Sequence, residues 1–298
     1  MLATPRARFS LPFHRVNGYI LIDAKVGRRA GRLMFDTGTE FPLFINRHVL
    51  PMAKDQFMAR GHAASGQALV LYRQRAPLRD LVLAGELAFA PLAGLPHADF
   101  SFLEAAISER FLGMLGHGFS RDYEFALDYQ QQILDFFALP AAGAADPDPE
   151  AGEVPQYRPD PAAALLLTMK FRPTGVNGKM PELEVQLGGQ RLRATVDTGN
   201  LGSLRLSPAL REQLEAQGLL RVTPGRYLLG QPSQHLRASL SGLSIQGVAL
   251  PPLQELHLTL DASGAPGQGP HLGLGYQFLK SYVSVWNYRR SEIRLYRP

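Results

Sequence analysis

The feature that most constrains the fold of this chain is an internal repeat. Residues 16–18 have the same sequence, Val-Asn-Gly, as residues 176–178. The tripeptide Asp-Thr-Gly occurs at residues 36–38 and again at residues 197–199, each time directly after an apolar run. A repeat of this kind indicates that one structural unit occurs twice in the chain. We therefore expect two similar halves.

A third repeated block lies near the end of each half. Residues 112–119 (LGMLGHGF) match residues 272–278 (LGLGYQF), and a tyrosine follows each block, at Tyr123 and Tyr282. The three blocks occur in the same order, and each copy is separated from the other by about 160 residues. The match therefore extends over the length of both halves.

The segment between the two copies has a different composition. Residues 140–164 are rich in proline, alanine and acidic residues and offer few side chains that could be buried. This composition is typical of an exposed, semi-extended connector. We therefore divide the chain into an N-terminal lobe (residues 1–139), a linker (140–164) and a C-terminal lobe (165–298).

The local pattern within each lobe is mostly that of β-strands. Short apolar runs such as residues 19–22 and 183–187 precede glycine turns, as in hairpins. With 29 glycines and 23 prolines, the chain favours many short strands over a helical bundle. One helix is clearly indicated, with Ser207 as N-cap, Pro208 in the first turn and Gly218 after the last turn. The predicted fold is mainly β, with two similar lobes related by a pseudo-twofold axis and a few short helices.

The composition excludes several kinds of function. The chain has no cysteine, so it has no disulfides, thiolate zinc sites or cysteine nucleophiles. Its histidines show no metal-binding spacing, and we expect no metal and no cofactor.

No apolar run approaches the roughly 20 residues of a transmembrane helix. The basic residues are scattered, so neither nucleic acid nor a membrane is an expected partner. The first residues lack the apolar core of a signal peptide, which favours the cytoplasm unless an export signal has been removed.

The two Asp-Thr-Gly turns contain the candidate catalytic residues. One such turn is ordinary loop chemistry, but two at equivalent places would bring Asp36 and Asp197 face to face across a pseudo-twofold axis. Two carboxyl groups held about 3 Å apart cannot both ionise, so one keeps a proton. The charged group can then take a proton from water while the protonated group donates to a carbonyl oxygen. This is general acid–base hydrolysis of an amide.

At these residues the chain resembles the aspartic peptidases of the pepsin and retropepsin superfamily. The resemblance rests on residues 35–39 (FDTGT) and 196–200 (VDTGN), each followed later by an apolar-apolar-Gly segment, and on the final residues 275–287. Each lobe has about the size of one retropepsin unit, so the chain resembles two fused units. The resemblance implies the bilobal aspartic-protease fold, with two β-barrel-like lobes, and implies Asp36 and Asp197 as the catalytic pair.

The resemblance also assigns the residues around the two aspartates. Family members usually have Ser or Thr directly after the Asp-Thr-Gly motif, where the hydroxyl supports the carboxylate. Thr39 fits this pattern and Asn200 does not, although an asparagine amide could donate the same hydrogen bond. The residues expected to support the active-site turns are Thr37, Gly38, Thr39, Thr198, Gly199 and Asn200.

Members of this family close a β-hairpin, the flap, over the substrate. In the first lobe the candidate flap lies within residues 61–75 and is centred near Gly66. Tyr72 could be the flap tyrosine, but its distance from Asp36 in the sequence favours a plain packing role. In the second lobe residues 224–227 form the equivalent turn.

The expected function is that of an aspartic endopeptidase which holds a peptide or protein substrate in a cleft between the lobes. A monomer should suffice, because both half-sites lie in one chain. Two alternatives stay open: a non-catalytic peptide-binding module on the same fold, and a processing peptidase for one partner protein. Fold alone does not establish activity. The two intact aspartates favour the enzyme, whereas Asn200 favours the binding module.

Overall fold

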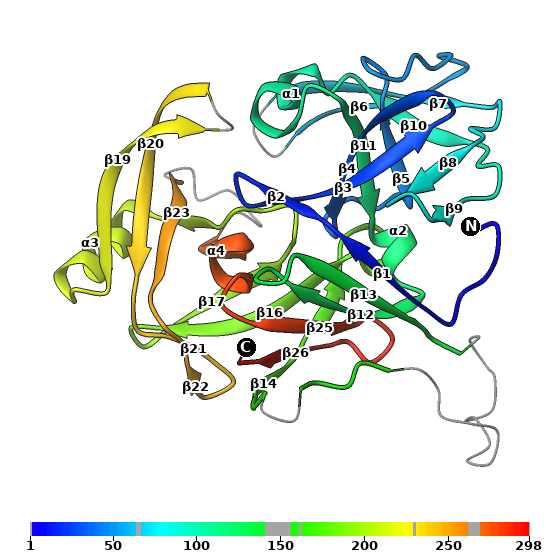
Figure 1. The fold of residues 1–298 in the computed structure, drawn as a ribbon. Helices are drawn as coiled ribbons and strands as arrows, with labels where there is room; N and C mark the ends of the chain where they lie inside the picture. Colours follow the sequence, from blue (N-terminus) through cyan, green and yellow to red (C-terminus); the bar gives the residue numbers. More distant parts are fainter. Residues whose placement is uncertain are drawn as a thin grey trace, which may run out of the picture.

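The computed structural model describes residues 2–63, 67–140, 156–160, 163–228, 231–261 and 269–297. These residues form a mainly β molecule with two lobes, built on three sheets (Figure 1). The predicted fold class, mainly β and bilobal, is confirmed.

The sheet of the first lobe is built from strands between residues 14 and 116. Its strands are β2 (His14–Val16), β3 (Tyr19–Val26), β4 (Arg29–Asp36), β5 (Leu43–Asn46), β6 (Gln56–His62), β7 (Ala68–Gln74), β8 (Leu81–Leu83), β9 (Leu87–Ala88), β10 (Leu95–Ala98) and β11 (Phe111–Gly116). The strand order is β6-β7-β10-β5-β11-β4-β3-β8-β9, and β2 pairs with β3. Strand β11 is buried along its whole length because it lies between β4, which runs parallel to it, and β5.

The second lobe repeats this arrangement. Its strands are β15 (Arg172–Thr174), β16 (Met180–Leu187), β17 (Gln190–Val196), β18 (Ser203–Leu206), β19 (Leu220–Leu228), β20 (Gln231–Leu240), β21 (Leu243–Ile245), β22 (Val248–Ala249), β23 (Leu253–Leu260) and β24 (His271–Leu274). The order is β19-β20-β23-β18-β24-β17-β16-β21-β22, and β15 pairs with β16. This strand order matches that of the first lobe strand for strand. The duplication inferred from three short sequence blocks therefore extends to the topology.

A third sheet joins the halves (Figure 1). Its strands are β1 (Arg8–Pro12), β12 (Tyr123–Asp128), β13 (Ile133–Ala138), β14 (Leu165–Lys170), β25 (Val283–Asn287) and β26 (Glu292–Tyr296), in the order β1-β13-β12-β25-β26-β14. The central strands β12 and β25 are antiparallel, and each half contributes three strands. The pseudo-twofold axis therefore passes between β12 and β25. There Phe125 stacks on the fully buried Trp286, with ring centroids 5.4 Å apart.

The helices are few and short in the described part of the chain. They are α1 (Ser101–Ile107), α2 (His117–Ser120), α3 (Pro208–Ala216), α4 (Tyr276–Leu279) and the single 3-10 turn η1 (Val176–Gly178). Helix α3 begins as predicted, because the hydroxyl of Ser207 accepts a hydrogen bond from the N–H of Leu210 at 3.2 Å. No described helix is long and apolar enough to cross a membrane.

Most of the predicted linker, residues 141–155 and 161–162, lies outside the described residues. The short stretch at 156–160 differs from an exposed connector, because Tyr157 packs on the third sheet. Its ring lies 6.3 Å from that of Phe137 and 5.9 Å from that of Tyr296, and its N–H donates to Oε1 of Glu124 at 3.1 Å. An aromatic side chain at this position gains more from burial than the surrounding prolines and acids would.

Candidate active site

The two Asp-Thr-Gly turns meet at the interface between the lobes and are locked to each other. The N–H of Thr37 donates to Oγ1 of Thr198 at 3.0 Å, and the N–H of Thr198 donates to Oγ1 of Thr37 at 3.1 Å. Both threonines are buried. Because buried polar groups need partners, this reciprocal exchange fixes one turn against the other.

The same arrangement brings the two carboxyl groups together. The N–H of Gly38 donates to Oδ1 of Asp36 at 2.9 Å and also to Oδ1 of Asp197 at 3.0 Å. The N–H of Gly199 donates to Oδ1 of Asp197 at 2.8 Å. Asp36 and Asp197 lie within hydrogen-bonding reach of each other. One N–H therefore serves two carboxyl groups that come from residues 161 positions apart in the chain.

Glycine is required after each threonine because each turn presses its backbone against the aspartate of the other half. A Cβ placed on Gly38 would lie 2.5 Å from Oδ2 of Asp197. A Cβ on Gly199 would collide with the carboxyl group of Asp36 in the same way. Any side chain at either position would push the two carboxyl groups apart.

The two turns differ at the residue that follows the glycine. Oγ1 of Thr39 donates to Oδ2 of Asp36 at 2.8 Å. The amide of Asn200 does not take this role for Asp197: its Nδ2 donates to Oγ of Ser203 at 3.2 Å, and its Oδ1 accepts from the N–H of Gly202 at 2.7 Å. Asn200 therefore stabilises its own turn but does not donate to the carboxyl group of Asp197, because its short amide side chain satisfies its own loop.

The closeness of the two carboxyl groups also changes how they titrate. Burial, followed by the negative charge of Asp36, raises the pKa of Asp197 to about 7. Two N–H groups, of Gly199 and Gly38, oppose that shift only in part. The hydroxyl of Thr39 favours the charged form of Asp36, because a donor to a carboxylate stabilises its ionised state. The pair therefore keeps one proton up to a higher pH than an isolated aspartate would.

The carboxyl groups open into a cavity of about 570 Å³ that we call the apolar cavity. Side chains of the first lobe supply most of its wall, and two residues of the second half, Lys179 and Met180, close one side. Besides the aspartates and their glycines, the apolar side chains that line it include Met34, Phe41, Phe44, Leu69, Leu71, Phe100, Phe102, Leu103, Ile107 and Met114.

The hairpin β6–β7 forms one wall of the apolar cavity, at the position predicted for the flap. Leu69 and Leu71 of β7 line the cavity. The predicted tip residue Gly66 lies outside the described residues. The structure does not bring Tyr72 to the aspartates, because neighbouring side chains of a strand point to opposite faces. Its ring instead stacks on that of His97, with centroids 6.0 Å apart, so the packing alternative describes this residue.

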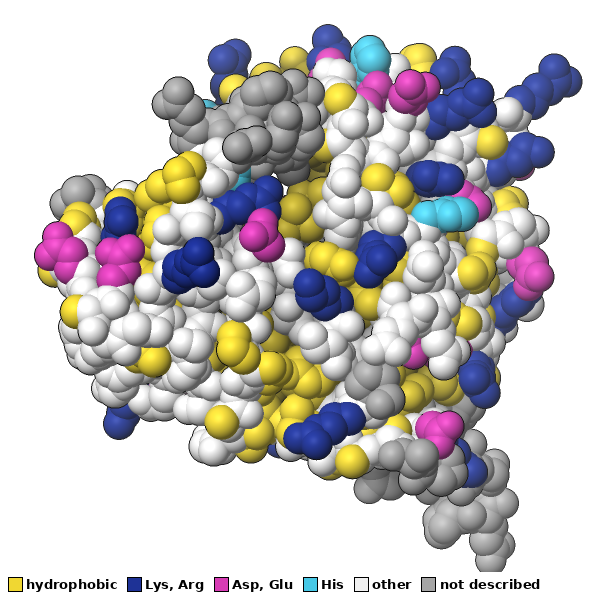
Figure 2. Space-filling view, turned by 60° about the vertical axis from the view of Figure 1, so that its left-hand side comes forward, with side chains coloured by type: hydrophobic (Ala, Val, Ile, Leu, Met, Phe, Trp, Pro, Cys, Tyr) yellow, Lys and Arg dark blue, Asp and Glu magenta, His cyan; other side chains and the backbone are white. Residues whose placement is uncertain are grey.

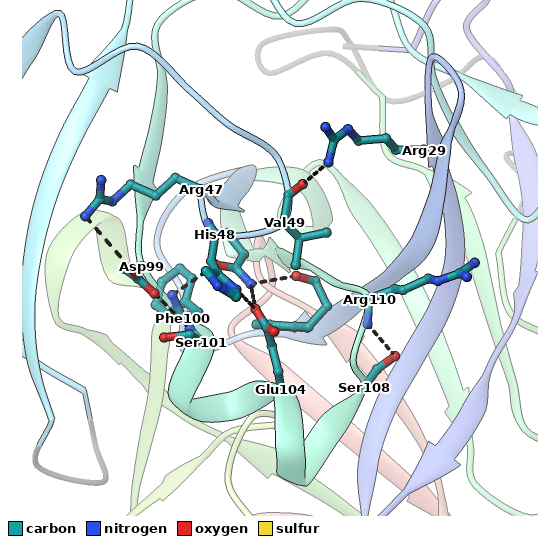
Figure 3. A network of polar contacts seen from close by, with 12 residues as sticks. Arg29, Arg47, His48, Val49, Asp99, Phe100, Ser101, Glu104, Ser108 and Arg110 are labelled. Carbon is teal, nitrogen blue, oxygen red and sulfur yellow. Dashed lines mark hydrogen bonds and ion pairs between the residues drawn. The ribbon is translucent and has the colours of Figure 1, made fainter.

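Helix α1 forms a second wall and is held in place by a buried asparagine. Nδ2 of Asn46 donates to Oε1 of Glu104 at 2.9 Å and to the carbonyl oxygen of Phe111 at 2.8 Å, while its Oδ1 accepts from the N–H of Phe100 at 3.0 Å. His48 contacts the same Glu104 oxygen at 2.8 Å (Figure 3). This helix, whose N-cap, Phe100, offers no capping side chain, was not predicted from the sequence.

Tyr19 is a site residue that the sequence analysis missed. It is buried and lines the apolar cavity, and burial together with the charges of Asp36 and Asp197 raises its pKa. The β3–β4 hairpin pairs Leu21 with Met34, and the same register places Tyr19 opposite Asp36. Counting back from the turn at Gly27 would have identified it.

No protein-family model matches this chain, and no curated protein matches it. Support for a function therefore comes from the site itself. The described residues contain no group of three or more His, Asp or Glu side chains arranged to hold a metal ion.

Proposed function

We propose that this protein is an aspartic endopeptidase that hydrolyses peptide bonds with the pair Asp36 and Asp197. The observation that carries the proposal is the N–H of Gly38, which donates to both carboxyl groups at 2.9 and 3.0 Å. A carboxyl pair this close shares one proton. One charged and one protonated carboxyl group are what acid–base hydrolysis of an amide needs.

In the first step, ionised Asp36 takes a proton from a water molecule, and the water oxygen forms a bond to the carbonyl carbon of the substrate. Asp197 gives its proton to the carbonyl oxygen at the same time. The product of this step is a neutral tetrahedral diol, with the proton now on Asp36 and the charge on Asp197. The hydroxyl of Thr39 favours Asp36 as the base because it stabilises the charged form.

In the second step, the bond between carbon and nitrogen breaks. The leaving nitrogen takes the proton from Asp36, and one hydroxyl of the diol returns a proton to Asp197. The products are a carboxylic acid and an amine, and both aspartates regain their starting states. Because no covalent intermediate forms with the protein, nucleophilic trapping should detect none.

The apolar cavity supports a peptide substrate with an apolar side chain next to the scissile bond. Its volume of about 570 Å³ lies in the range of ordinary ligand pockets. The hairpin β6–β7 lies beside the aspartates and leaves an extended peptide room to run between hairpin and carboxyl groups. Burial of an apolar side chain against Leu71, Phe100 and Ile107 would supply binding energy and orientation.

The test is digestion of a diverse mixture of unstructured peptides at pH 3 to 8, with mass spectrometry of the new termini. Asp36→Asn and Asp197→Asn should each lower kcat by about 10²- to 10⁴-fold, the usual contribution of a general acid or base. The control is Asp122→Asn, which alters an exposed carboxylate away from the cavity and should keep full activity. A chelator should change nothing. Full activity in either aspartate variant would disprove the shared pair.

The pH profile provides a second readout. Because the pKa of Asp197 is raised to about 7, the protonated acid is lost above that pH. We expect kcat/KM to fall about tenfold per pH unit above pH 7. Activity that continues to rise through pH 9 would contradict the assigned proton on Asp197. Binding of peptides without cleavage at any pH would favour a binding module.

A further inference from the structure

A second cavity, of about 660 Å³, lies between the halves, and we call it the polar cavity. It shares Tyr19 with the apolar cavity, so this buried tyrosine separates the two spaces. One side of the polar cavity comes from β2 and the turn before β3, and the other from β20, β23 and α4. It therefore spans both halves of the molecule beside the aspartates.

The polar cavity is lined by more positive than negative groups. Arg15 and Arg237 carry fixed positive charges, and the rings of His235 and His257 lie among them, whereas Glu255 is the carboxylate among the lining residues. Figure 2 shows Lys and Arg side chains gathered around a hollow in which apolar side chains are visible. Guanidinium groups bind carboxylates with strong, directional hydrogen bonds.

The two arginines reach the cavity from opposite halves and are oriented by neighbours. Nη1 of Arg15 donates to the hydroxyl of Tyr276 at 2.8 Å, and its guanidinium carbon lies 5.7 Å from the centroid of that ring. Nη1 of Arg237 is hydrogen-bonded to Oε2 of Glu255. A guanidinium has five N–H donors, so both groups keep donors for a ligand after these bonds.

The histidines lie beside the arginine of the second lobe. β20 and β23 pair Arg237 with His257, and the ring of His235 lies 5.2 Å from that of His257. Burial lowers the pKa of His257, and the positive charge of its neighbours His235 and Arg237 lowers it too.

We propose that the polar cavity binds the side-chain carboxylate of an Asp or Glu residue in the peptide substrate. This inference rests on the proposed peptidase function and names its substrate class: peptides with an apolar residue for the apolar cavity and an acidic residue a few positions away, on the other side of Tyr19. Arg15 and Arg237 hold the carboxylate from opposite halves. An acidic peptide is thereby distinguished from one that is apolar throughout.

The test uses peptides with one fixed apolar residue and a single Glu or Gln moved through the positions on both sides of it. At one position the wild-type protein should cleave the Glu peptide with a kcat/KM at least about tenfold above that of the Gln peptide. Arg15→Gln should reduce this preference to less than about threefold, because it removes one of the two charges. A preference that is absent in the wild type, or unchanged in Arg15→Gln, would overturn the inference.

A paired variant keeps the charge balance. Arg237→Gln combined with Glu255→Gln removes an arginine without leaving a carboxylate unpaired, and it should also abolish the preference. The matched control is Arg191→Gln combined with Glu184→Gln, an exposed ion pair of 3.6 Å on the β16–β17 hairpin. This control should keep the preference of the wild type.

Binding measurements separate this inference from the proposed function. Fluorescence polarisation with the same labelled peptides is recorded on the variant with Asp36→Asn and Asp197→Asn. Tighter binding of the Glu peptide without any cleavage by the wild type would support the polar cavity and disprove the peptidase. Cleavage of both peptides at equal rates would support the peptidase and disprove the polar cavity as a carboxylate site. Neither cleavage nor selective binding would disprove both.

Discussion

The two cavities border the same buried tyrosine, but their walls differ: the wall of the apolar cavity is mostly hydrophobic, whereas charged and polar side chains make up much of the wall of the polar cavity. The apolar cavity has Met34, Phe44 and Leu71 in its wall, whereas the polar cavity has Arg15 and Arg237. The strands around them are equivalent in order. Duplication therefore preserved the backbone arrangement, while the side chains that line the cavities diverged.

Equivalent ladder positions illustrate this divergence. In the first lobe β7 and β10 pair Tyr72 with His97, and the two rings stack on each other. In the second lobe β20 and β23 pair Arg237 with His257, and both line the polar cavity. Strand pairing fixes the position and direction of each side chain but not its residue type. Two lobes with the same strand order can therefore present different side chains.

Apart from loss of either aspartate, the largest effect is expected in the apolar cavity. Leu71→Ala removes part of the wall next to the aspartates, so a substrate with a medium-sized apolar side chain loses contacts there. We expect kcat/KM for that substrate to fall by about 10- to 100-fold, with less loss for a bulkier side chain. Digestion of peptides that differ at one apolar position measures this. Leu78→Ala, outside both cavities, is the control, and equal losses in the two variants would contradict the assignment of Leu71.

The raised pKa of Asp197 should make the free energy of unfolding depend on pH. The folded protein keeps a proton on Asp197 up to about pH 7, whereas an unfolded chain loses it near pH 4. The folded state binds more protons in that window, so the free energy of unfolding should fall as pH rises through it. Asp197→Asn removes this loss and should exceed the wild type by about 2 kcal/mol at pH 8, with no gain at pH 4. Urea unfolding measures both, and a gain independent of pH would disprove the linkage.

Thr39 and Asn200 take equivalent places in the two turns, and exchanging their roles should change proton transfer. Thr39→Ala removes the hydroxyl bond to Asp36 and should lower kcat about tenfold. Asn200→Thr offers Asp197 an equivalent hydroxyl, which should lower the pKa of Asp197 and move the alkaline limb of the activity profile to lower pH. Profiles of kcat/KM against pH test both changes. Identical profiles in all three proteins would show that the asymmetry has no consequence for proton transfer.

The smallest effect is expected at the ion pair between the halves. Nζ of Lys179 lies 3.8 Å from Oε2 of Glu40, and about a quarter of each side chain is exposed. Glu40→Gln should lower the free energy of unfolding by less than about 1 kcal/mol. Chemical denaturation in low and high salt measures this. A loss of several kcal/mol would mean that this pair, rather than the exchange between Thr37 and Thr198, fastens the turns.

Much of the fold and of the carboxyl pair could be predicted from the sequence. Helix α3 was predicted from the Ser207 N-cap, and the carboxyl pair Asp36 and Asp197 was predicted from the two Asp-Thr-Gly motifs. Helix α1 was not predicted, and its place against the sheet depends on Asn46 of a distant strand. The flap role, the less favoured alternative for Tyr72, does not hold, because the side of a strand on which a residue points depends on its ladder register.

The sequence by itself determined that one unit occurs twice, that the chain is mainly β, and that each unit ends an apolar strand at an aspartate. These features are local, because periodicity, turn residues and repeats are written in neighbouring positions. Only the tertiary structure decided that Gly38 serves both carboxyl groups, that Asn200 turns away from Asp197, and that Tyr19 separates two cavities. These depend on contacts between residues far apart in the chain, and a sequence pattern carries no direct record of such contacts.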